Sequence, residues 1–270
     1  MTGELKPISS RDNPTVKRLH ALANSARDRR VFGQTLLDGP HLVAAALDAG
    51  WRLRELAVSD HGIEREEIAA LLRRCAGVPA VRLADPLFAH VSPVETPSGL
   101  IAVMDLPAPP EERPFAESLL VLDGVQDAGN LGTILRTAAA VGLRDVLMTP
   151  GCAQAWSPRV LRAGMGGHFA LRIHEQADVA GLLHAYPGDI LATGLGSSAR
   201  ELYEFDLRGP VAWLFGAEGR GLSPAVALLA TGTVIIPMPG AVESLNVAAA
   251  AAVCLFEQLR QGRAVPAAGR

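Results

Sequence analysis

Residues 234–258 read VIIPMPGAVESLNVAAAAAVCLFEQ. The first three residues are all β-branched and predict a buried strand. Residues 237–240, PMPG, interrupt both strand and helix, so a loop must follow the strand. Asn246 is a favourable N-cap residue for the run after it. A strand, a loop carrying Ser244 and Asn246, and a helix can hold a ligand at the carboxyl end of the strand, although a plain connecting loop with a helix cap fits these residues as well.

The helix predicted after this loop includes the alanine run 248–252, the strongest helix-forming stretch in the chain. We expect Gly262 to end the helix. Because the residues are apolar on nearly every side through Phe256, we expect the helix to be buried on more than one face.

Composition limits the class of protein. The chain has 270 residues, 49% of them hydrophobic, which suffices for one large domain or two ordinary ones. Its three cysteines, Cys75, Cys152 and Cys254, are far apart and lack metal-ligand spacing, so we expect a reducing compartment, no disulfide framework and no metal. Without an apolar signal region or a run of membrane-spanning length, we expect a soluble, cytoplasmic protein that is not bound to membranes.

Charge gives a weaker indication of the partner. The net charge of −3 does not suggest nucleic acid, but residues 1–30 hold seven basic side chains against three acidic ones. Nearly every cation is an arginine, which can bind phosphate through two hydrogen bonds and stack on bases. A charge-rich terminus is also often merely solvated, so charge alone leaves both interpretations open.

Residues 1–106 alternate between predicted helices and strands, which is typical of a small α/β domain. We expect helices at 13–22, 41–49, 64–75 and 86–91, and strands at 32–38, 53–59, 80–83 and 100–104. The segment 105–117, DLPAPPEERPFAE, has four prolines and five charges and predicts an extended, semi-rigid spacer. We therefore expect two domains, 1–106 and 118–270, joined by a linker at 107–117.

The second domain also alternates, with strands expected at 119–122, 146–148, 170–173, 189–193, 211–215 and 234–236 and helices at 131–141 and 157–165. Three polar or glycine-rich loops, 193–198, 216–223 and 237–246, each follow a predicted buried strand. In a parallel sheet such loops share one edge, where ligands bind. The chain lacks GxGxxG at the start of a helix, a P-loop and a GxSxG elbow, so the common dinucleotide, nucleotide and hydrolase fingerprints are absent.

Three segments together resemble the SpoU/TrmH family of RNA ribose 2'-O-methyltransferases in the SPOUT superfamily. They are DGVQDAGNLGTILRTA at 123–138, LFGAEGRGLS at 214–223 and IPMPGAVESLNV at 236–247. SPRVLRAGMGGHF at 157–169 also resembles the family, while LLDGPHLVAAALDAG and ETPSGLIAVM in the first domain resemble a substrate-binding domain often fused ahead of it. The chain departs from the family at Ala128, where proline is usual, and at Gly164, where serine is common.

The resemblance implies a SPOUT α/β domain with a deep trefoil knot, S-adenosylmethionine as cofactor, RNA as substrate and a homodimer formed through the C-terminal domain. The catalytic group it implies is Asn130, Arg136, Glu218, Ser244 and Asn246. The expected cofactor contacts are Thr193, Gly194, Gly216, Gly221, Ile236, Met238 and Leu245. The expected RNA contacts are Arg11, Lys17, Arg29, Arg30, Arg159 and Arg162.

The resemblance also assigns Arg136 the role of base. A guanidinium hardly ever loses its proton in a protein, so we expect Arg136 to bind an RNA phosphate and stabilise the developing oxyanion, while that phosphate or a water takes the proton. The extra domain favours a large structured RNA, 23S-type ribosomal RNA rather than transfer RNA. The alternatives are a transfer RNA ribose 2'-O-methyltransferase, a non-catalytic RNA-binding protein on the same scaffold, and an unrelated α/β enzyme with another adenosine cofactor.

Overall fold

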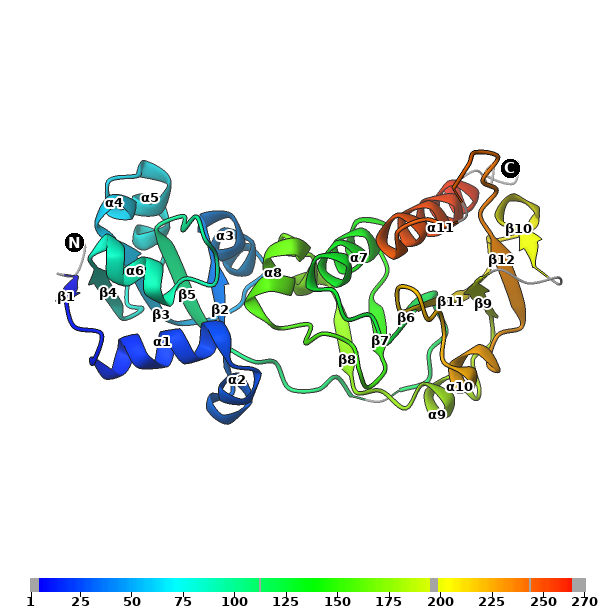
Figure 1. Cartoon of the computed structure of the whole chain (residues 1–270), viewed down its shortest axis with the longest axis horizontal. Coiled ribbons are helices and arrows are strands. Elements are labelled where there is room, and N and C mark those ends of the chain that lie inside the picture. Colours follow the sequence, from blue (N-terminus) through cyan, green and yellow to red (C-terminus); the bar gives the residue numbers. More distant parts are fainter. Residues whose placement is uncertain (1–4, 112, 195–198, 243, 264–270) are drawn as a thin grey trace, which may run out of the picture. The chain divides into compact units, whose positions relative to one another are not determined.

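The computed structural model describes residues 5–111, 113–194, 199–242 and 244–263, and Figure 1 labels their helices and strands. They form two compact units. The first unit holds the residues up to Ala108 together with Trp156–Phe169, and the second holds Pro109–Ala155 and the residues from Ala170 onward. The sequence placed everything beyond residue 117 in one domain, so the position of Trp156–Phe169 is the main difference.

The first unit is built on a five-stranded mixed sheet. Its strands, in order across the sheet, are β1 (Lys6–Ile8), β4 (Ala80–Leu83), β3 (Leu53–Ser59), β5 (Leu100–Asp105) and β2 (Gln34–Asp38), with β5 antiparallel to both neighbours. Its helices are α1 (Pro14–Asn24), α2 (Ala26–Phe32), α3 (Pro40–Asp48), α4 (Asp60–Ile63), α5 (Glu66–Arg74), α6 (Asp85–Val91) and α8 (Pro158–Gly164). Val16, Leu19 and Leu22 on one face of α1 are fully buried in the core, as their spacing predicted.

Helix α2 was missed by the sequence analysis, which expected a strand to begin at residue 32. Ser25 caps α2 by accepting a hydrogen bond from the Asp28 amide, and Gly33 ends it in the left-handed conformation with a φ of 62°. The strand β2 therefore begins only at Gln34.

Helix α8 belongs to the first unit because its apolar side packs there. Val160 and Leu161 of α8 are fully buried, and the helix lies on β2. Before it, the Trp156 carbonyl accepts a hydrogen bond from the Thr35 hydroxyl at 2.6 Å, and the Trp156 and Trp51 rings are 5.5 Å apart. These contacts are long-range in sequence, which is why local patterns did not show them.

The second unit is built on a seven-stranded, wholly parallel sheet. Its strands, in order across the sheet, are β10 (Arg200–Glu201), β12 (Gly232–Ile235), β9 (Asp189–Thr193), β11 (Val211–Gly216), β6 (Leu119–Asp123), β7 (Asp145–Met148) and β8 (Arg172–Glu175). Its helices are α7 (Ala128–Ala140), α9 (Val179–Leu183), α10 (Pro224–Ala227) and α11 (Val247–Arg263), with a 3-10 turn at Leu202–Glu204. Another 3-10 turn, Gly167–Ala170, spans the point where the chain passes from the first unit to the second. Strands β6 and β7 are buried throughout, as expected of parallel strands covered on both faces. The predicted α/β class is confirmed.

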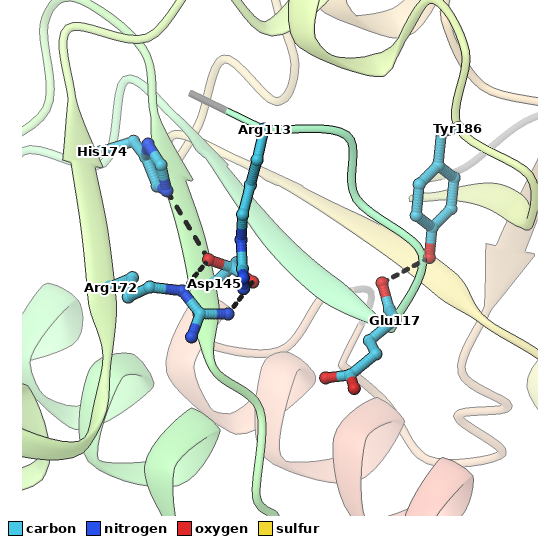
Figure 2. Close-up of polar contacts among 6 residues, drawn as sticks. All are labelled: Arg113, Glu117, Asp145, Arg172, His174 and Tyr186. Carbon is cyan, nitrogen blue, oxygen red and sulfur yellow. Dashed lines mark hydrogen bonds and ion pairs between the residues drawn. The ribbon is translucent and has the colours of Figure 1, made fainter. Parts of the chain in front are cut away.

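The predicted linker has no helix or strand among its described residues after Asp105, but its second half is packed rather than free. Phe115 is buried in the core of the second unit, and the Glu117 carbonyl accepts a hydrogen bond from the Tyr186 hydroxyl at 3.1 Å (Figure 2). Burial of the Phe115 side chain favours this packing, because it removes apolar surface from water.

Helix α11 corrects the prediction that Gly262 ends it. It runs through Gly262 to Arg263. The Gln261 side chain connects the last turn of the helix to the segment before β11, because it accepts a hydrogen bond from the Leu207 backbone amide at 2.9 Å. That contact overrides the low helix propensity of glycine. Within the single chain Ala248, Ala251 and Leu255 of α11 are buried while Phe256 is 51% exposed, so burial on more than one face stays a prediction.

Candidate functional site

Three loops of the second unit meet at the carboxyl edge of its sheet through a chain of side-chain hydrogen bonds. The Asn246 amide group donates to Asn130 Oδ1 at 2.9 Å, and the Asn130 amide group donates to the Glu218 carboxylate. Asn130 lies 116 residues from Asn246 and 88 from Glu218, so one small cluster joins the loops after β6 and β11 to the loop before α11. These are the three segments that the sequence motifs singled out.

Local capping positions both asparagines. The Asp127 carboxylate caps α7 by accepting a hydrogen bond from the backbone amide of Asn130 at 2.7 Å, so that Asn130 lies in the first turn of the helix. Ala128 begins α7, so the absence of the usual proline does not unwind this turn. Asn246 caps α11, as predicted, since its Oδ1 accepts from the amides of Ala248 and Ala249 at 2.9 and 3.2 Å. The side-chain NH2 group of Asn246 remains free to bind Asn130.

The glycine-rich loop after β11 is closed by a pair of backbone hydrogen bonds. The Ala217 amide donates to the Gly221 carbonyl at 3.1 Å, and the Gly221 amide donates back at 2.9 Å. A Cβ added at Gly216 would lie 2.1 Å from the Gly221 carbonyl carbon, so only glycine fits there. The closed loop carries the exposed Glu218 to Asn130.

A buried carboxylate that the predicted site did not include anchors this loop. Asp123, at the end of β6, accepts from the Ser223 amide at 2.6 Å and from the Thr149 hydroxyl at 2.7 Å. The Thr149 hydroxyl oxygen in turn accepts from the Gly124 amide at 3.1 Å. An aspartate at the end of a buried strand was visible in the sequence, but its partners 26 and 100 residues away were not.

Two of the five predicted catalytic residues stand apart from this cluster. Arg136 is exposed on α7, six residues beyond Asn130 and so about 9 Å further along the helix axis. Neither its guanidinium nor the exposed Ser244 hydroxyl has a hydrogen-bond or ion-pair partner among the residues that the structure describes. Both groups are thus available to a ligand.

The predicted cofactor contacts lie along the ends of three adjacent strands. Thr193 ends β9 and donates to the Leu214 carbonyl of β11 at 3.4 Å, while the Gly194 amide donates to the Val234 carbonyl of β12 at 3.1 Å. Beyond β12, Ile236 and Met238 are half-buried and Leu245 is 39% exposed. Gly216 and Gly221 belong to the closed loop after β11. Residues 195–198 and Glu243, which the predicted loops include, lie outside the described residues.

The predicted RNA contacts all fall in the first unit. Five of them are exposed: Arg11, Lys17, Arg30, Arg159 and Arg162. The structure contradicts the sixth, because Arg29 is only 7% exposed and its guanidinium donates to the Leu22 carbonyl at 2.9 Å. Helix α2, which the sequence analysis missed, turns Arg29 inward and Arg30 outward.

A second charged cluster occupies the opposite edge of the same sheet (Figure 2). Arg172 binds Asp145 at the start of β7 through two hydrogen bonds of 2.7 and 2.5 Å, His174 approaches Asp145 to 3.6 Å and Arg113 approaches it to 3.8 Å. Burial would raise the pKa of Asp145, but its contacts with His174 and Arg172 and the charge of Arg113 lower it to about 2. Since the loops above lie at the carboxyl ends of the strands, this cluster is not part of the site.

No group of three or more His, Cys, Asp or Glu side chains among the described residues is arranged to hold a metal ion. None of the helices that these residues form is both long enough and apolar enough to cross a membrane.

Comparison with known proteins gives matches along nearly the whole chain. Residues 117–256 match the SpoU rRNA Methylase family, and residues 13–102 match the MRM3-like substrate binding domain. The chain is 30% identical to the 23S rRNA (guanosine(2553)-2'-O)-methyltransferase RlmP of Bacillus subtilis, over 93% of this chain and 98% of the relative. It is also 30% identical to the 23S rRNA (uridine(2479)-2'-O)-methyltransferase of Streptomyces viridochromogenes, over 96% of this chain and 94% of the relative. Among solved structures, the AdoMet-bound rRNA methyltransferase of Sinorhizobium meliloti superposes with a TM-score of 0.82 at 29% identity, covering 96% of this chain and 98% of that one.

Proposed function

Because the chain belongs to the SpoU rRNA methylase family of RNA 2'-O-methyltransferases, we propose that it methylates a ribose 2'-hydroxyl of 23S-type ribosomal RNA with S-adenosylmethionine. The observation that carries this proposal is the Asn246–Asn130–Glu218 hydrogen-bond chain, which holds three motif loops at one sheet edge. The names of the two relatives support the choice of ribosomal RNA. The first unit is then the RNA-binding domain and the second the catalytic one.

The carboxyl edge of the second sheet fits the proposed cofactor. Ile236 and Leu245 leave apolar side-chain surface uncovered beside β12, which suits an adenine ring. Among the residues that the structure describes, a Cβ built on Gly194 would meet only the Thr233 methyl group at 3.7 Å, which leaves room for a ligand beside these residues. We assign the polar contacts to backbone groups of Thr193, Gly194, Gly216, Gly221 and Met238. When bound, S-adenosylmethionine supplies an electrophilic methyl group on a sulfonium.

The residues of the chain then prepare the ribose hydroxyl. Arg136 acts as a cation that binds an RNA phosphate and stabilises the oxyanion developing at the 2'-oxygen. The hydroxyl proton passes to that phosphate or to a water. Asn130 and Glu218 hold the loops on either side in register, and Ser244 contacts the cofactor or the ribose. Holding two reacting atoms in place is worth several kcal/mol.

The proposal includes a homodimer and a trefoil knot in the second unit. Support for the dimer comes from α11, where Ala248, Ala251 and Leu255 are buried against the chain's own core but Phe256 and Ala249 are exposed. A second copy would cover that apolar face. The knot rests on the family resemblance.

The test is methyl transfer from labelled S-adenosylmethionine to unmodified 23S, 16S and transfer RNA transcripts, followed by digestion to nucleosides. Label on a ribose 2'-oxygen of 23S RNA is the expected result, and Asn130→Ala serves as the control with strongly reduced activity. Label in transfer RNA alone would show that the substrate is transfer RNA and not ribosomal RNA. Label on a base would overturn the chemistry, and cofactor binding without any label would favour a non-catalytic RNA-binding protein.

A further inference from the structure

A single carboxylate lies at the base of the two loops that carry Asn130 and Glu218. Asp123 is the last residue of β6, and it pairs in register with Gly216, the last residue of β11. At these two neighbouring positions the chain leaves the sheet, once toward Asn130 and once toward Glu218. A group held here can therefore fix the direction in which both loops start.

Each oxygen of the Asp123 carboxylate binds one of the two loops. One oxygen, Oδ2, accepts from the Ser223 backbone amide at 2.6 Å, at the far end of the glycine-rich loop. The other, Oδ1, accepts from the Thr149 hydroxyl at 2.7 Å. The Thr149 oxygen in turn accepts from the Gly124 amide at 3.1 Å, at the start of the loop that leads to Asn130. Thr149 is thus a bridge, and one side chain holds both loops.

The Asp123 carboxylate is buried without a cation. It is 7% exposed, and no ion pair of Asp123 occurs within the part of the chain that the structure describes. Asp145, the buried carboxylate at the other edge of the sheet, is bound by Arg172 and faces Arg113. Burying a carboxylate costs free energy that ion pairs or hydrogen bonds must offset. For Asp123 the hydrogen bonds that offset this cost lead to the two loops.

The same two loops meet again at their tips. There the Asn130 amide group donates to the Glu218 carboxylate, which is exposed. A hydrogen bond between groups at the surface competes with water and fixes a loop only weakly. Near the base, a Cβ built on Gly124 would lie 3.7 Å from the Ala217 methyl group, so the two loops run side by side. The buried contacts of Asp123 therefore determine where the tips can meet.

We propose that Asp123 is a positioning residue for the methyl transfer. It sets the shape of the glycine-rich loop that receives the cofactor, and it brings Glu218 within reach of Asn130. It acts through the Ser223 amide and through Thr149, and not by touching the reacting atoms. A loop that is held in its bound shape loses less entropy when the ligand binds. In naming the cofactor and the reaction, this inference rests on the proposed function.

The first test measures the affinity of the full-length chain for S-adenosylmethionine by calorimetry. Asp123→Ala should weaken binding about tenfold or more, because it removes hydrogen bonds to a charged group that hold the loop. Asp145→Ala is the matched control, since it also removes a buried carboxylate from the same sheet, and it should bind the cofactor as the wild type does. Urea unfolding identifies a temperature at which both variants are folded.

A milder variant replaces Asp123→Ala if that protein does not fold. Asp123→Asn keeps an oxygen that can accept from the Ser223 amide, but its NH2 group cannot accept from the Thr149 hydroxyl. It is compared with Asp145→Asn in the same way. It should weaken cofactor binding less than Asp123→Ala but more than Asp145→Asn.

Thr149→Val tests the bridge to the other loop. Valine keeps the shape of threonine but can neither donate to Asp123 nor accept from the Gly124 amide. The methylation rate at saturating cofactor should therefore fall about fivefold, as expected for one lost hydrogen bond, with little change in the KM for RNA. Thr149→Ser should restore the rate. A role in packing alone predicts the reverse order, because serine lacks the buried methyl group that valine keeps.

The outcomes separate this inference from the proposed function. If Asp123→Ala binds the cofactor no more weakly than Asp145→Ala, the inference fails, while methyl transfer by the wild type still stands. If serine at position 149 does not restore the rate that valine lowers, the inference also fails. If the wild type binds the cofactor but labels no RNA, the proposed function fails, and the cofactor affinities alone decide the role of Asp123. If the wild type does not bind S-adenosylmethionine, both fail.

Discussion

The two edges of the second sheet use charged and polar groups in opposite ways. At the amino edge, Asp145 is buried and bound by Arg172 at 2.5 Å with a second cation nearby. At the carboxyl edge, Glu218 is exposed, and Arg136 has no described partner. Paired, buried charges stabilise a fold, whereas exposed groups without partners have bonds left for a substrate. We therefore expect stability and activity to depend on different ends of the same strands.

The largest expected effect is on activity at the carboxyl edge. Asn130→Ala removes the residue that joins the loops of Glu218 and Asn246, so methyl transfer should fall about 100-fold, or about 2.7 kcal/mol of activation free energy. The cluster is at the surface, so the melting temperature should change by only a few degrees. Single-turnover methylation and thermal unfolding measure the two quantities. A large loss of stability with normal single-turnover rates would break the comparison between the edges.

The matching variant at the amino edge is Asp145→Asn. It keeps the shape of the side chain but removes the charge that Arg172 and Arg113 face. The free energy of unfolding should fall by at most about 2 kcal/mol, since the pKa shift sets an upper value and the exposed Arg113 is partly screened by water. Urea unfolding gives this quantity. Methyl transfer at a temperature where the variant is folded should equal that of the wild type.

Arg136→Lys sharpens the role of the unpaired guanidinium. Lysine keeps the positive charge but cannot bind phosphate through two parallel hydrogen bonds, so we expect about a tenfold loss of the methylation rate at saturating cofactor. The variant should unfold like the wild type, because Arg136 is exposed and unpaired within the described chain. A rate close to that of the wild type would argue against the bidentate contact with RNA.

The last expected effect is the pH dependence of the stability that Asp145 contributes. Its pKa is about 2 in the folded chain against 3.8 for a free aspartate, so its contribution to stability is complete above about pH 4 and is lost as the pH falls toward 2. The stability difference between the wild type and Asp145→Asn should therefore narrow over that range. The free energy of unfolding is measured over this pH range in both proteins, and the difference between them removes the contribution of the other carboxylates. A constant difference down to pH 2 would contradict the assignment.

Local elements were predictable because their causes are local. The strands 53–59, 80–83 and 189–193 have the predicted bounds, and Asn246 caps its helix as expected. The predictions that failed concern segments whose structure depends on a contact with a residue far away in the sequence. Gly262 failed to end α11 because of Gln261, and the proline-rich linker packs because of Phe115. Arg29 was misplaced because one turn of helix decides which side of α2 it faces.

By itself the sequence determined the α/β class, the order of most elements and the three loops that carry Asn130, Glu218 and Asn246, since strand runs, caps and glycines act over a few residues. Only the tertiary structure decided which of these groups meet. The hydrogen bonds that build the site span 88 and 116 residues, and the anchor from Asp123 to Ser223 spans 100. Such pairs depend on the order of strands in the sheet, which no local pattern encodes, and the same holds for the packing of α8 on β2 in the first unit.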